Sequence, residues 1–405
     1  DVRSKCTGIH TSSQRLQPPS GTRILVTNMI YLYSDIISRS GGIETYLHAL
    51  ALHLHGKTEI EFRVAVAEQT RCPLLDGLEE KGIDVYRQMR IPGDSWLARQ
   101  HLLIWWLKRQ LNSGDMVFCV RQPMPSLYLK TVRAVHSQGA HIAASWMFAP
   151  KFLVPEEESR ESFCQAVEET DVVVSVSECT KDQFRSVYNY HGPIEVVRYH
   201  NRLHFDEPVP LPDGPPWHIG FLGRVDIEQK NIDVLLQALR HVIDAGANVQ
   251  LNLHGRGPDS DIQKLKALRD ELGLLDQVTF HGEYDHRTDL QDIVAANHFF
   301  VYTSLYEGGP CFTLLELLQA GRFCVAAPVG GIPDIYEGHS KAGRLVDSKS
   351  PQEIASALLK TIDDLSEDRI DIDSVRRRYF QGLDIDTAHR QWCRALDVPA
   401  TALTS

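Results

Sequence analysis

The stretch from Phe299 to Asp334 constrains the fold of this chain more than any other. It begins with four apolar residues, Phe299 to Tyr302, which have the composition and length of a buried strand. The sequence Glu-Gly-Gly-Pro at 307–310 then ends any regular element, because glycine and proline disfavour helix and strand interiors. An apolar run from Phe312 to Leu318 predicts a helix that stops at Gly321, a residue suited to a helix C-cap. The stretch therefore predicts a strand, a glycine loop and a helix.

The chemistry of this unit favours a phosphate ligand flanked by hydroxyl groups. The first turn of a helix has backbone N–H groups without intrahelical acceptors, which suits an anion. Glu307 precedes the glycine loop, and Glu316 lies about one turn into the helix. Carboxylates beside a phosphate are best explained as acceptors for sugar hydroxyls, as in dinucleotide-binding folds. The combination predicts a nucleotide-sugar, although a glycine pair alone fits an ordinary buried strand–helix unit with solvated carboxylates equally well.

The two glutamates and the loop between them resemble the donor-binding signature of the retaining family 4 glycosyltransferases, also called glycosyl transferases group 1. Eight residues separate Glu307 from Glu316, whereas the family pattern has seven. We interpret the difference as a one-residue insertion near Pro310 and Cys311. The resemblance implies that Glu307 contacts the donor sugar and that Glu316 holds the ribose hydroxyls. It also implies donor contacts from the loop and the helix start, at Gly309, Phe312, Thr313 and Leu314.

Two cations follow the first strand predicted in the C-terminal half. The run from His218 to Leu222 predicts that strand, and Arg224 and Lys230 come between it and the next predicted helix. Open α/β sheets bind ligands at this end of their strands, and two fixed cations can neutralise a departing diphosphate without a metal. On spacing alone, the pair also fits surface residues of a loop. The pair resembles the Gly-Arg…Lys donor motif of the same family, with a gap one residue longer. The resemblance implies that Arg224, Lys230 and Glu307 are catalytic.

A second glycine pair, Gly41-Gly42, lies between a predicted strand and a predicted helix. The strand is expected at 22–27, its loop at 28–40 and the helix from Ile43 to Leu54. Alone, the pair only permits a tight turn. It resembles the GG-x-E segment of the same family, which implies that these glycines let the backbone approach the donor diphosphate or the acceptor. Tyr284 follows a later predicted strand, at the point where family members meet the base of the nucleotide.

Segments of strand type and helix type alternate along the chain, a pattern of parallel sheets with crossover helices. At 405 residues the chain has room for two such domains. Six of the eleven residues at 206–216 are proline or glycine, which predicts a linker. The resemblance covers roughly Thr22 to Leu396 and implies the α/β GT-B fold, two Rossmann-like domains facing across a cleft. The expected division is a flexible N-terminal tail at 1–20, an acceptor domain at 21–205, the linker at 206–216, a nucleotide-sugar donor domain at 217–375 and a C-terminal helix at 376–405 that crosses back to the first domain.

The helix predicted at 96–111 has two interpretations. It carries three tryptophans and three basic residues: Trp96, Trp105, Trp106, Arg99, Lys108 and Arg109. The favoured interpretation is a crossover helix packed on the core with an ordinary basic outer edge. The alternative is a peripheral membrane contact near a lipid-linked acceptor, because aromatic and basic residues on one helix suit a lipid surface.

The strand predicted at His141 to Ala144 departs from the family pattern. Many family members have a histidine that faces the donor near the end of this strand, and this chain has none in register. We therefore expect either Trp146 or Ser145 to line the cleft, unless the register of the strand differs.

Charge and cysteine content exclude several classes of protein. The net charge of −11 argues against nonspecific nucleic-acid binding, which requires a basic face. The sequence contains no run of about 18 apolar residues that would span a membrane, and its polar start contains no apolar signal core. Eight cysteines without CxxC pairs indicate reduced thiols. We expect a cytoplasmic protein, with the inner face of the membrane as the alternative location.

Three Asp-x-Asp pairs raise the question of a metal. They are Asp259/Asp261, Asp371/Asp373 and Asp384/Asp386. In the other large glycosyltransferase fold such a pair holds a divalent ion. Here the first follows a proline loop and the others lie in the C-terminal tail, so we interpret them as chance surface pairs and expect no metal.

Together these features predict a retaining glycosyltransferase without a cofactor. The expected donor is a UDP-sugar, with a GDP-sugar next, and the acceptor is a hydroxyl of a glycan, a lipid-linked glycan or a small molecule. Two alternatives remain: an inactive donor-binding partner subunit and a nucleotide-sugar epimerase of the same fold. A dinucleotide oxidoreductase is disfavoured, because the loop Gly255–Pro258 lacks the third glycine of that fingerprint.

Overall fold

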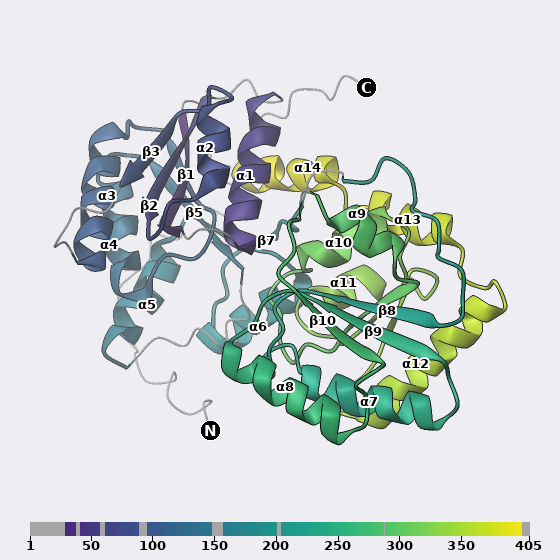
Figure 1. The fold of residues 1–405 in the computed structure, drawn as a ribbon. Helices are drawn as coiled ribbons and strands as arrows, with labels where there is room; N and C mark the ends of the chain where they lie inside the picture. Colours follow the sequence, from purple (N-terminus) through teal and green to yellow (C-terminus); the bar gives the residue numbers. More distant parts are fainter. Residues whose placement is uncertain are drawn as a thin grey trace. The chain divides into compact units, whose positions relative to one another are not determined.

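The computed structural model describes residues 29–37, 41–56, 61–88, 95–147, 157–200, 204–286 and 288–398. The chain divides into two compact units, which are described separately (Figure 1). Unit 1 comprises residues 1–199 and 388–405, and unit 2 comprises residues 200–387. The division falls just before the proline-rich stretch at 206–216, and the chain returns to unit 1 within its last helix.

The described strands of unit 1 form a seven-stranded sheet in the order β3-β2-β1-β4-β5-β6-β7. Every pairing is parallel, as the alternation of strands and helices predicts. The elements are β1 (Met29–Ile37), α1 (Gly42–His55), β2 (Glu61–Glu68), α2 (Pro73–Glu79), β3 (Val85–Gln88), α3 (Trp96–Gln110), β4 (Met116–Cys119), α4 (Pro125–His136), β5 (His141–Trp146), α5 (Glu157–Glu169), β6 (Val172–Ser175), α6 (Glu178–Tyr188), β7 (Ile194–Val196) and α14 (Ile385–Leu396).

The first strand of unit 1 lies later in the chain than predicted. The segment 22–27 lies outside the described residues, and the segment 28–40, predicted as a loop, contains β1. The prediction of a loop was wrong because MIYLYSDII is rich in aromatic and β-branched residues, which favour strands. This strand is central in the sheet, where Ile30 pairs with Phe62 on β2 and with Met116 on β4. Parallel strands in this position are covered on both faces, which accounts for the burial of almost the whole of β1.

The described strands of unit 2 form a six-stranded parallel sheet in the order β10-β9-β8-β11-β12-β13. In Figure 1, helices α7, α8 and α12 lie along one face of this sheet, and α9, α10 and α13 lie along the other. The elements are β8 (Trp217–Leu222), α7 (Ile232–Asp244), β9 (Val249–His254), α8 (Asp259–Glu271), β10 (Val278–Gly282), α9 (Leu290–Ala295), β11 (Phe299–Tyr302), α10 (Phe312–Gln319), β12 (Cys324–Ala326), α11 (Ile332–Tyr336), β13 (Gly343–Leu345), α12 (Pro351–Ser366) and α13 (Ile372–Phe380).

The two sheets confirm the predicted fold class, which is a pair of Rossmann-like α/β units. The strand at Phe299–Tyr302 and the helix that begins at Phe312 occur as predicted. Gly321 follows the C-cap of α10 with a φ of 76°, a left-handed conformation that glycine adopts without strain. The C-terminal region contains two helices, α13 and α14, because the chain breaks at Gly382, where φ is 97°.

The proline-rich stretch packs on unit 2 through a buried arginine. The Arg322 guanidinium, which is fully buried, donates to the backbone carbonyls of Val209 and Pro210 and also to those of Val294 and Asn297. Four carbonyl acceptors offset the cost of burying the charge. Burial lowers the pKa of Arg322 to about 10. The first half of the stretch predicted as a linker is therefore anchored to the body of unit 2.

Candidate functional site

The loops after β8 and β11 bring the three predicted catalytic side chains into one hydrogen-bonded chain. The Lys230 ammonium donates to Glu307 Oε1, and Arg224 donates to the side-chain oxygen of Gln229. Gln229 Nε2 lies 3.4 Å from Glu307 Oε2 and 3.1 Å from the Tyr306 carbonyl oxygen. Gln229 thereby connects Arg224 to the Lys230–Glu307 pair. The two strands are neighbours in the parallel sheet, so their carboxyl ends meet at the same edge.

Asp226 holds the loop that carries both cations. Its Oδ1 accepts from the backbone N–H groups of Gln229, at 2.8 Å, and Lys230, at 2.9 Å, while Oδ2 accepts from Arg224. Burial alone would raise the pKa of Asp226, but these N–H groups and the Arg224 guanidinium lower it. The carboxylate therefore stays ionised and holds the loop in which Lys230 immediately precedes Asn231, the N-cap of α7.

Lys230 and Glu307 form a mostly buried ion pair. Their side chains are 12% and 11% exposed, whereas that of Arg224 is 56% exposed. Burial alone would lower the pKa of Lys230, but the Glu307 carboxylate outweighs this effect and raises it. Lys230 therefore remains a cation at neutral pH. The site thus contains one sheltered cation, one sheltered carboxylate and one solvent-facing guanidinium.

Close backbone packing sets the position of the glycine loop. A Cβ at Gly330 would lie 2.5 Å from the Glu307 carbonyl oxygen, and one at Gly331 would lie 2.5 Å from the Pro310 ring. Gly330 also has a φ of 55°, which side-chain-bearing residues rarely adopt. Glycine is therefore required at positions 330 and 331, where the backbone packs directly against the loop at 307–310. Gly309 is buried within this packed loop.

Helix α10 begins directly after the loop. Its N-cap is Cys311, whose side chain does not cap the helix, and its Sγ lies 3.3 Å from the Thr313 hydroxyl. Phe312 and Thr313 are half-buried on the first turn, and Leu314 is fully buried in the core of unit 2. The N-terminus of α10 thus directly follows the glycine loop, and the positive end of a helix favours an anion.

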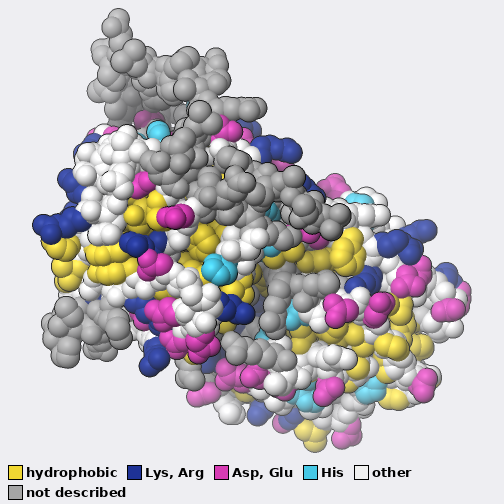
Figure 2. Space-filling view, turned by 90° about the horizontal axis from the view of Figure 1, so that it is seen from above, with side chains coloured by type: hydrophobic (Ala, Val, Ile, Leu, Met, Phe, Trp, Pro, Cys, Tyr) yellow, Lys and Arg dark blue, Asp and Glu magenta, His cyan; other side chains and the backbone are white. Residues whose placement is uncertain are grey.

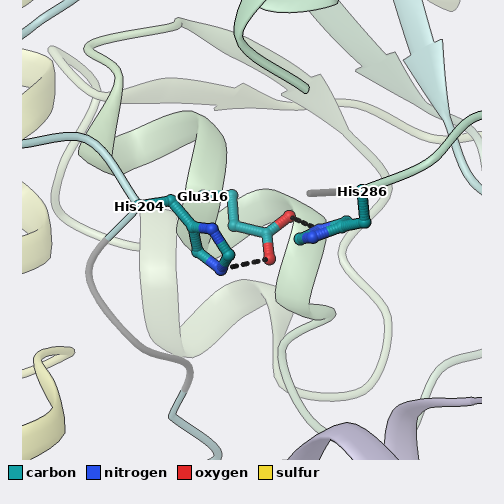
Figure 3. Close-up of side chains that lie close together, drawn as sticks. All are labelled: His204, His286 and Glu316. Atoms are coloured by element: carbon teal, nitrogen blue, oxygen red, sulfur yellow. Dashed lines mark hydrogen bonds and ion pairs between the residues drawn. The ribbon is translucent and has the colours of Figure 1, made fainter. Parts of the chain in front are cut away.

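Glu316, on the second turn of α10, is fully buried between two histidines (Figure 3). His286 Nε2 lies 2.7 Å from Glu316 Oε2, and His204 Nε2 lies 3.6 Å from Glu316 Oε1. Tyr284 lies close by, with its ring centroid 6.3 Å from that of His286. Burial, reinforced by the Glu316 carboxylate, raises the pKa of Tyr284 above its ordinary value. A ribose hydroxyl that reached Glu316 would replace a histidine at the carboxylate.

The predicted glycine pair of unit 1 lies at the start of α1. Gly41 is the N-cap, with an extended φ of 174°, and Gly42 is the first helical residue. A Cβ at Gly41 would meet only the end of the flexible Glu44 side chain, at 2.7 Å. The local backbone therefore does not require glycine at position 41.

Neither candidate at the end of β5 is an exposed cleft residue. Trp146 is fully buried, and its ring packs against aromatic rings of the unit 1 core: Tyr128, Phe163, Phe184 and Tyr188. Ser145 is also buried. The strand extends two residues further than predicted, which carries both side chains into the sheet.

One aspartate of each Asp-x-Asp pair accepts a hydrogen bond from a backbone N–H group. Asp371 accepts from the Asp373 N–H at the start of α13, and Asp384 accepts from the Thr387 N–H at the start of α14. Asp261 lies in the first turn of α8 and accepts from the Ile227 N–H at 3.3 Å. Aspartates in these positions satisfy backbone donors at helix starts.

Sequence reasoning missed four residues of the site: Asp226, Gln229, His204 and His286. Asp226 carried a local signal, since an aspartate before a helix start commonly accepts from backbone N–H groups. The histidines carried no local signal, because they approach Glu316 from segments far apart in the chain.

On the face shown in Figure 2, basic and acidic side chains are interspersed.

Residues 216–364, most of unit 2, match the family model described as glycosyl transferases group 1. A phosphatidyl-myo-inositol mannosyltransferase of Mycolicibacterium smegmatis is 30% identical over 162 residues, which are 38% of this chain and 39% of that protein. The chain thus spans about two fifths of the length of this relative. A GDP-mannose-dependent alpha-(1-6)-phosphatidylinositol monomannoside mannosyltransferase of Mycobacterium tuberculosis is 26% identical, over 84% of this chain and 89% of that protein.

Solved structures show the same fold over nearly the whole chain. The structure of Anabaena Alr3699/HepE in complex with UDP aligns with a TM-score of 0.74 at 16% identity. The alignment covers 92% of this chain and 100% of that one. The two sheets therefore have the GT-B fold.

Proposed function

We propose that this chain is a group 1 glycosyltransferase that transfers a sugar from a nucleoside-diphosphate-sugar to a hydroxyl group, with retention of configuration at the sugar; the match of residues 216–364 to that family supports the proposal. The single observation that carries the proposal is the chain of contacts from Arg224 through Gln229 to Glu307 and Lys230. It gathers two cations and a carboxylate at the carboxyl edge of a parallel sheet, where open α/β folds bind nucleotides.

The two cations are suited to stabilise a leaving diphosphate. Lys230 is sheltered from water, so its charge acts on a nearby phosphate with little screening. Arg224 is exposed enough to rotate toward a ligand, and its guanidinium can bind two phosphate oxygens at once. The N–H groups near Thr313 at the start of α10 add to the same positive potential. Charge that develops on the diphosphate as the glycosidic bond breaks is thereby neutralised without a metal.

The carboxylates then face the hydroxyl groups of the donor. Glu307 lies beside Lys230, so a sugar bound next to the diphosphate meets it directly; it orients the sugar and stabilises positive charge at the reacting carbon. Glu316 accepts from the ribose hydroxyls, and Tyr284 lies at the base. Gly309, Phe312 and Leu314 shape the donor loop. Gly41 and Gly42, at the start of α1, let the backbone approach the donor diphosphate or the acceptor.

Two donors remain in the proposal, with a UDP-sugar favoured and a GDP-sugar next. A structural neighbour binds UDP, which supports the first. A relative that aligns over most of the chain is named as GDP-mannose-dependent, which supports the second. Both named relatives act on inositol lipids, which supports a lipid-linked acceptor. A glycan and a small molecule are the other two candidate acceptors.

Helix α3 is a candidate for contact with the membrane that would hold a lipid-linked acceptor. Its inner side packs on the core, where Trp106 stacks on Tyr86 with ring centroids 3.7 Å apart. Its outer side exposes Leu97, Leu102 and Trp105, each by 39% or more. The helix contains no acidic residue, and Arg109 lies over the Trp105 ring. We propose that this outer side touches anionic lipid. Within the described residues, none of the helices has the length and hydropathy needed to cross a bilayer.

A thermal-shift screen against UDP, GDP, ADP, dTDP and NAD without added metal tests the donor site first. A ligand that binds only the folded state raises the melting temperature by mass action. One nucleoside diphosphate should raise it, and Arg224→Ala should reduce the shift. A shift with NAD alone would overturn the donor site, and so would the absence of a shift with every nucleotide tested.

Product analysis separates the transferase from its alternatives. Incubation with the matching nucleotide-sugar and candidate acceptors should release the nucleoside diphosphate only when an acceptor is present. An epimerase would convert the nucleotide-sugar without acceptor, and an inactive partner subunit would bind the donor without turnover. Near-normal turnover by folded Arg224→Ala would contradict the assignment of Arg224 to the leaving group.

A further inference from the structure

Three side chains of the types that bind transition metals converge in unit 2. Glu316 projects from α10, His286 from the turn between β10 and α9, and His204 from the segment that precedes β8 (Figure 3). One potential ligand atom from each lies within 4.8 Å of the others. We propose that His204, His286 and Glu316 form a binding site for a zinc-class divalent ion, and that the bound ion opposes binding of the donor nucleotide.

Only one of the two histidine contacts of Glu316 has the length of a direct hydrogen bond. His286 Nε2 is at hydrogen-bond distance from Glu316, 2.7 Å, but His204 Nε2 lies 3.6 Å from the other carboxylate oxygen. That separation is too long for a good hydrogen bond. Two ligands of one tetrahedral zinc ion, each about 2.0–2.1 Å from it, lie roughly 3.4 Å apart. Small side-chain rotations therefore bring all three atoms to ligand distance.

The ligand set and its burial favour zinc over magnesium or calcium. Two imidazoles and one carboxylate are ligands that zinc binds in open sites, whereas magnesium and calcium prefer oxygen ligands. Glu316 is 1% exposed, His204 12% and His286 37%. The carboxylate is thus sheltered from water while the His286 side remains accessible. A fourth position is open to water or to a ligand atom from solvent.

The proposed ion would act as an inhibitor and not as a cofactor. This step rests on the proposed function, in which Glu316 accepts from the ribose of the donor. A carboxylate oxygen that binds an ion is not available to a ribose hydroxyl, and an ion fixed between the two histidines occupies the space in front of it. Metal and nucleotide therefore bind in competition, and sugar transfer itself needs no metal.

The metal site is tested with Co²⁺, which substitutes for Zn²⁺ and absorbs visible light in a tetrahedral site. The full chain, treated with chelator, is titrated with Co²⁺ and followed by absorption and by bound-metal analysis. The double variant His204→Gln/His286→Gln should lose one equivalent of bound Co²⁺ together with the tetrahedral absorption. Each single variant should weaken binding at least about tenfold. Glutamine retains a hydrogen-bond donor toward Glu316, which helps the variants to fold.

A second histidine pair provides the matched control. The rings of His254 and His281 stack with centroids 4.1 Å apart, and His281 bonds to Asn252 instead of a carboxylate. His254→Gln/His281→Gln should leave the Co²⁺ equivalent unchanged. Equal Co²⁺ binding by the wild type and by His204→Gln/His286→Gln would overturn the site, and the three side chains would then be only a polar contact.

Competition is measured in the same titration with UDP and, separately, GDP. The nucleotide that binds should weaken Co²⁺ binding, and Co²⁺ should weaken nucleotide binding by the same factor. Nucleotide binding that leaves the Co²⁺ absorption and affinity unchanged would overturn the antagonism. If neither nucleotide binds the metal-free chain, the proposed function fails, while the Co²⁺ titration of the two double variants still decides the metal site.

Discussion

Lys230 and Glu307 pair across two neighbouring strands of one sheet, although they lie far apart in the chain. The Glu307 carboxylate is the charge that most raises the pKa of Lys230, and both side chains are largely sheltered from water. The pair keeps a cation and a carboxylate ready at the same edge of the sheet. A donor can therefore bring its diphosphate to one member and its sugar hydroxyls to the other.

Removal of Lys230 should abolish most transfer activity. Lys230→Ala should lower kcat by about 10²–10³, because a charge-stabilising group at the leaving diphosphate is lost. It should also destabilise the fold, since Glu307 is left buried without its partner. Steady-state kinetics and thermal unfolding measure the two effects. Lys360→Ala, an exposed lysine of α12, should change neither.

A double variant separates catalysis from stability at the same pair. Lys230→Met/Glu307→Gln removes both charges, so it should regain much of the stability lost in Lys230→Ala. It should remain inactive, because the cation for the diphosphate is still missing. Recovery of activity together with stability would contradict a catalytic role for Lys230.

Gly330→Ala should disturb the donor loop. A Cβ there would lie 2.5 Å from the Glu307 carbonyl oxygen, and the φ of 55° adds strain. Gly338 has a similar φ of 74°, and nothing lies within 4 Å of a Cβ placed there. Gly338→Ala therefore measures the cost of the backbone conformation alone, a loss of about 1–2 kcal/mol in the free energy of unfolding. Nucleotide binding by thermal shift should weaken in Gly330→Ala and stay normal in Gly338→Ala. Equal binding by both variants would mean that the Gly330 contact does not position the loop.

The stability of the protein should depend on pH through His136 in unit 1. A hydrogen bond to Asp171, at 2.9 Å, raises the pKa of His136 and outweighs the opposing effect of burial. Glu169 adds to this attraction, and His141 Nδ1 also lies 3.8 Å from Asp171. Because the folded pKa exceeds the unfolded value of about 6.5, this contribution is full below that pH. It is lost as pH rises through the folded pKa.

The difference in melting temperature between wild type and His136→Gln reports this contribution. The difference should be largest at about pH 5.5 and shrink toward pH 8.5. Other titrating groups cancel in the comparison, since both proteins contain them. A difference that is constant across this range would show that His136 does not gain its proton affinity from folding.

Helix α3 should bind anionic vesicles. Leu97→Ser/Trp105→Ser removes exposed apolar surface that would enter the lipid interface, so it should reduce co-sedimentation with vesicles of anionic phospholipid. Leu275→Ser removes a comparably exposed leucine outside α3 and should leave binding unchanged. Equal binding by all three proteins, or no binding by the wild type, would overturn the membrane contact.

Local patterns were enough to predict most of the elements that carry the site. The apolar run at Phe299–Tyr302, the glycine break and the run from Phe312 predicted β11, its loop and α10, because strand length and helix breaking depend on neighbouring residues. The aromatic and β-branched residues of segment 29–37 also favour a strand, but Ser34 and Asp35 interrupt the apolar run, and the segment was predicted as a loop. Pairing on both sides with β2 and β4 decides that strand.

The sequence by itself determined the parallel α/β architecture, the position of Arg224, Lys230 and Glu307 in loops that follow strands, and the position of Glu316 on the helix after the glycine loop, since these follow from patterns within a few residues. Only the tertiary structure decided that Gln229 links Arg224 to Glu307, that Trp146 belongs to the core, and that two histidines enclose Glu316. The physical reason is that side-chain contacts between distant segments depend on strand order and loop packing, which no local pattern encodes.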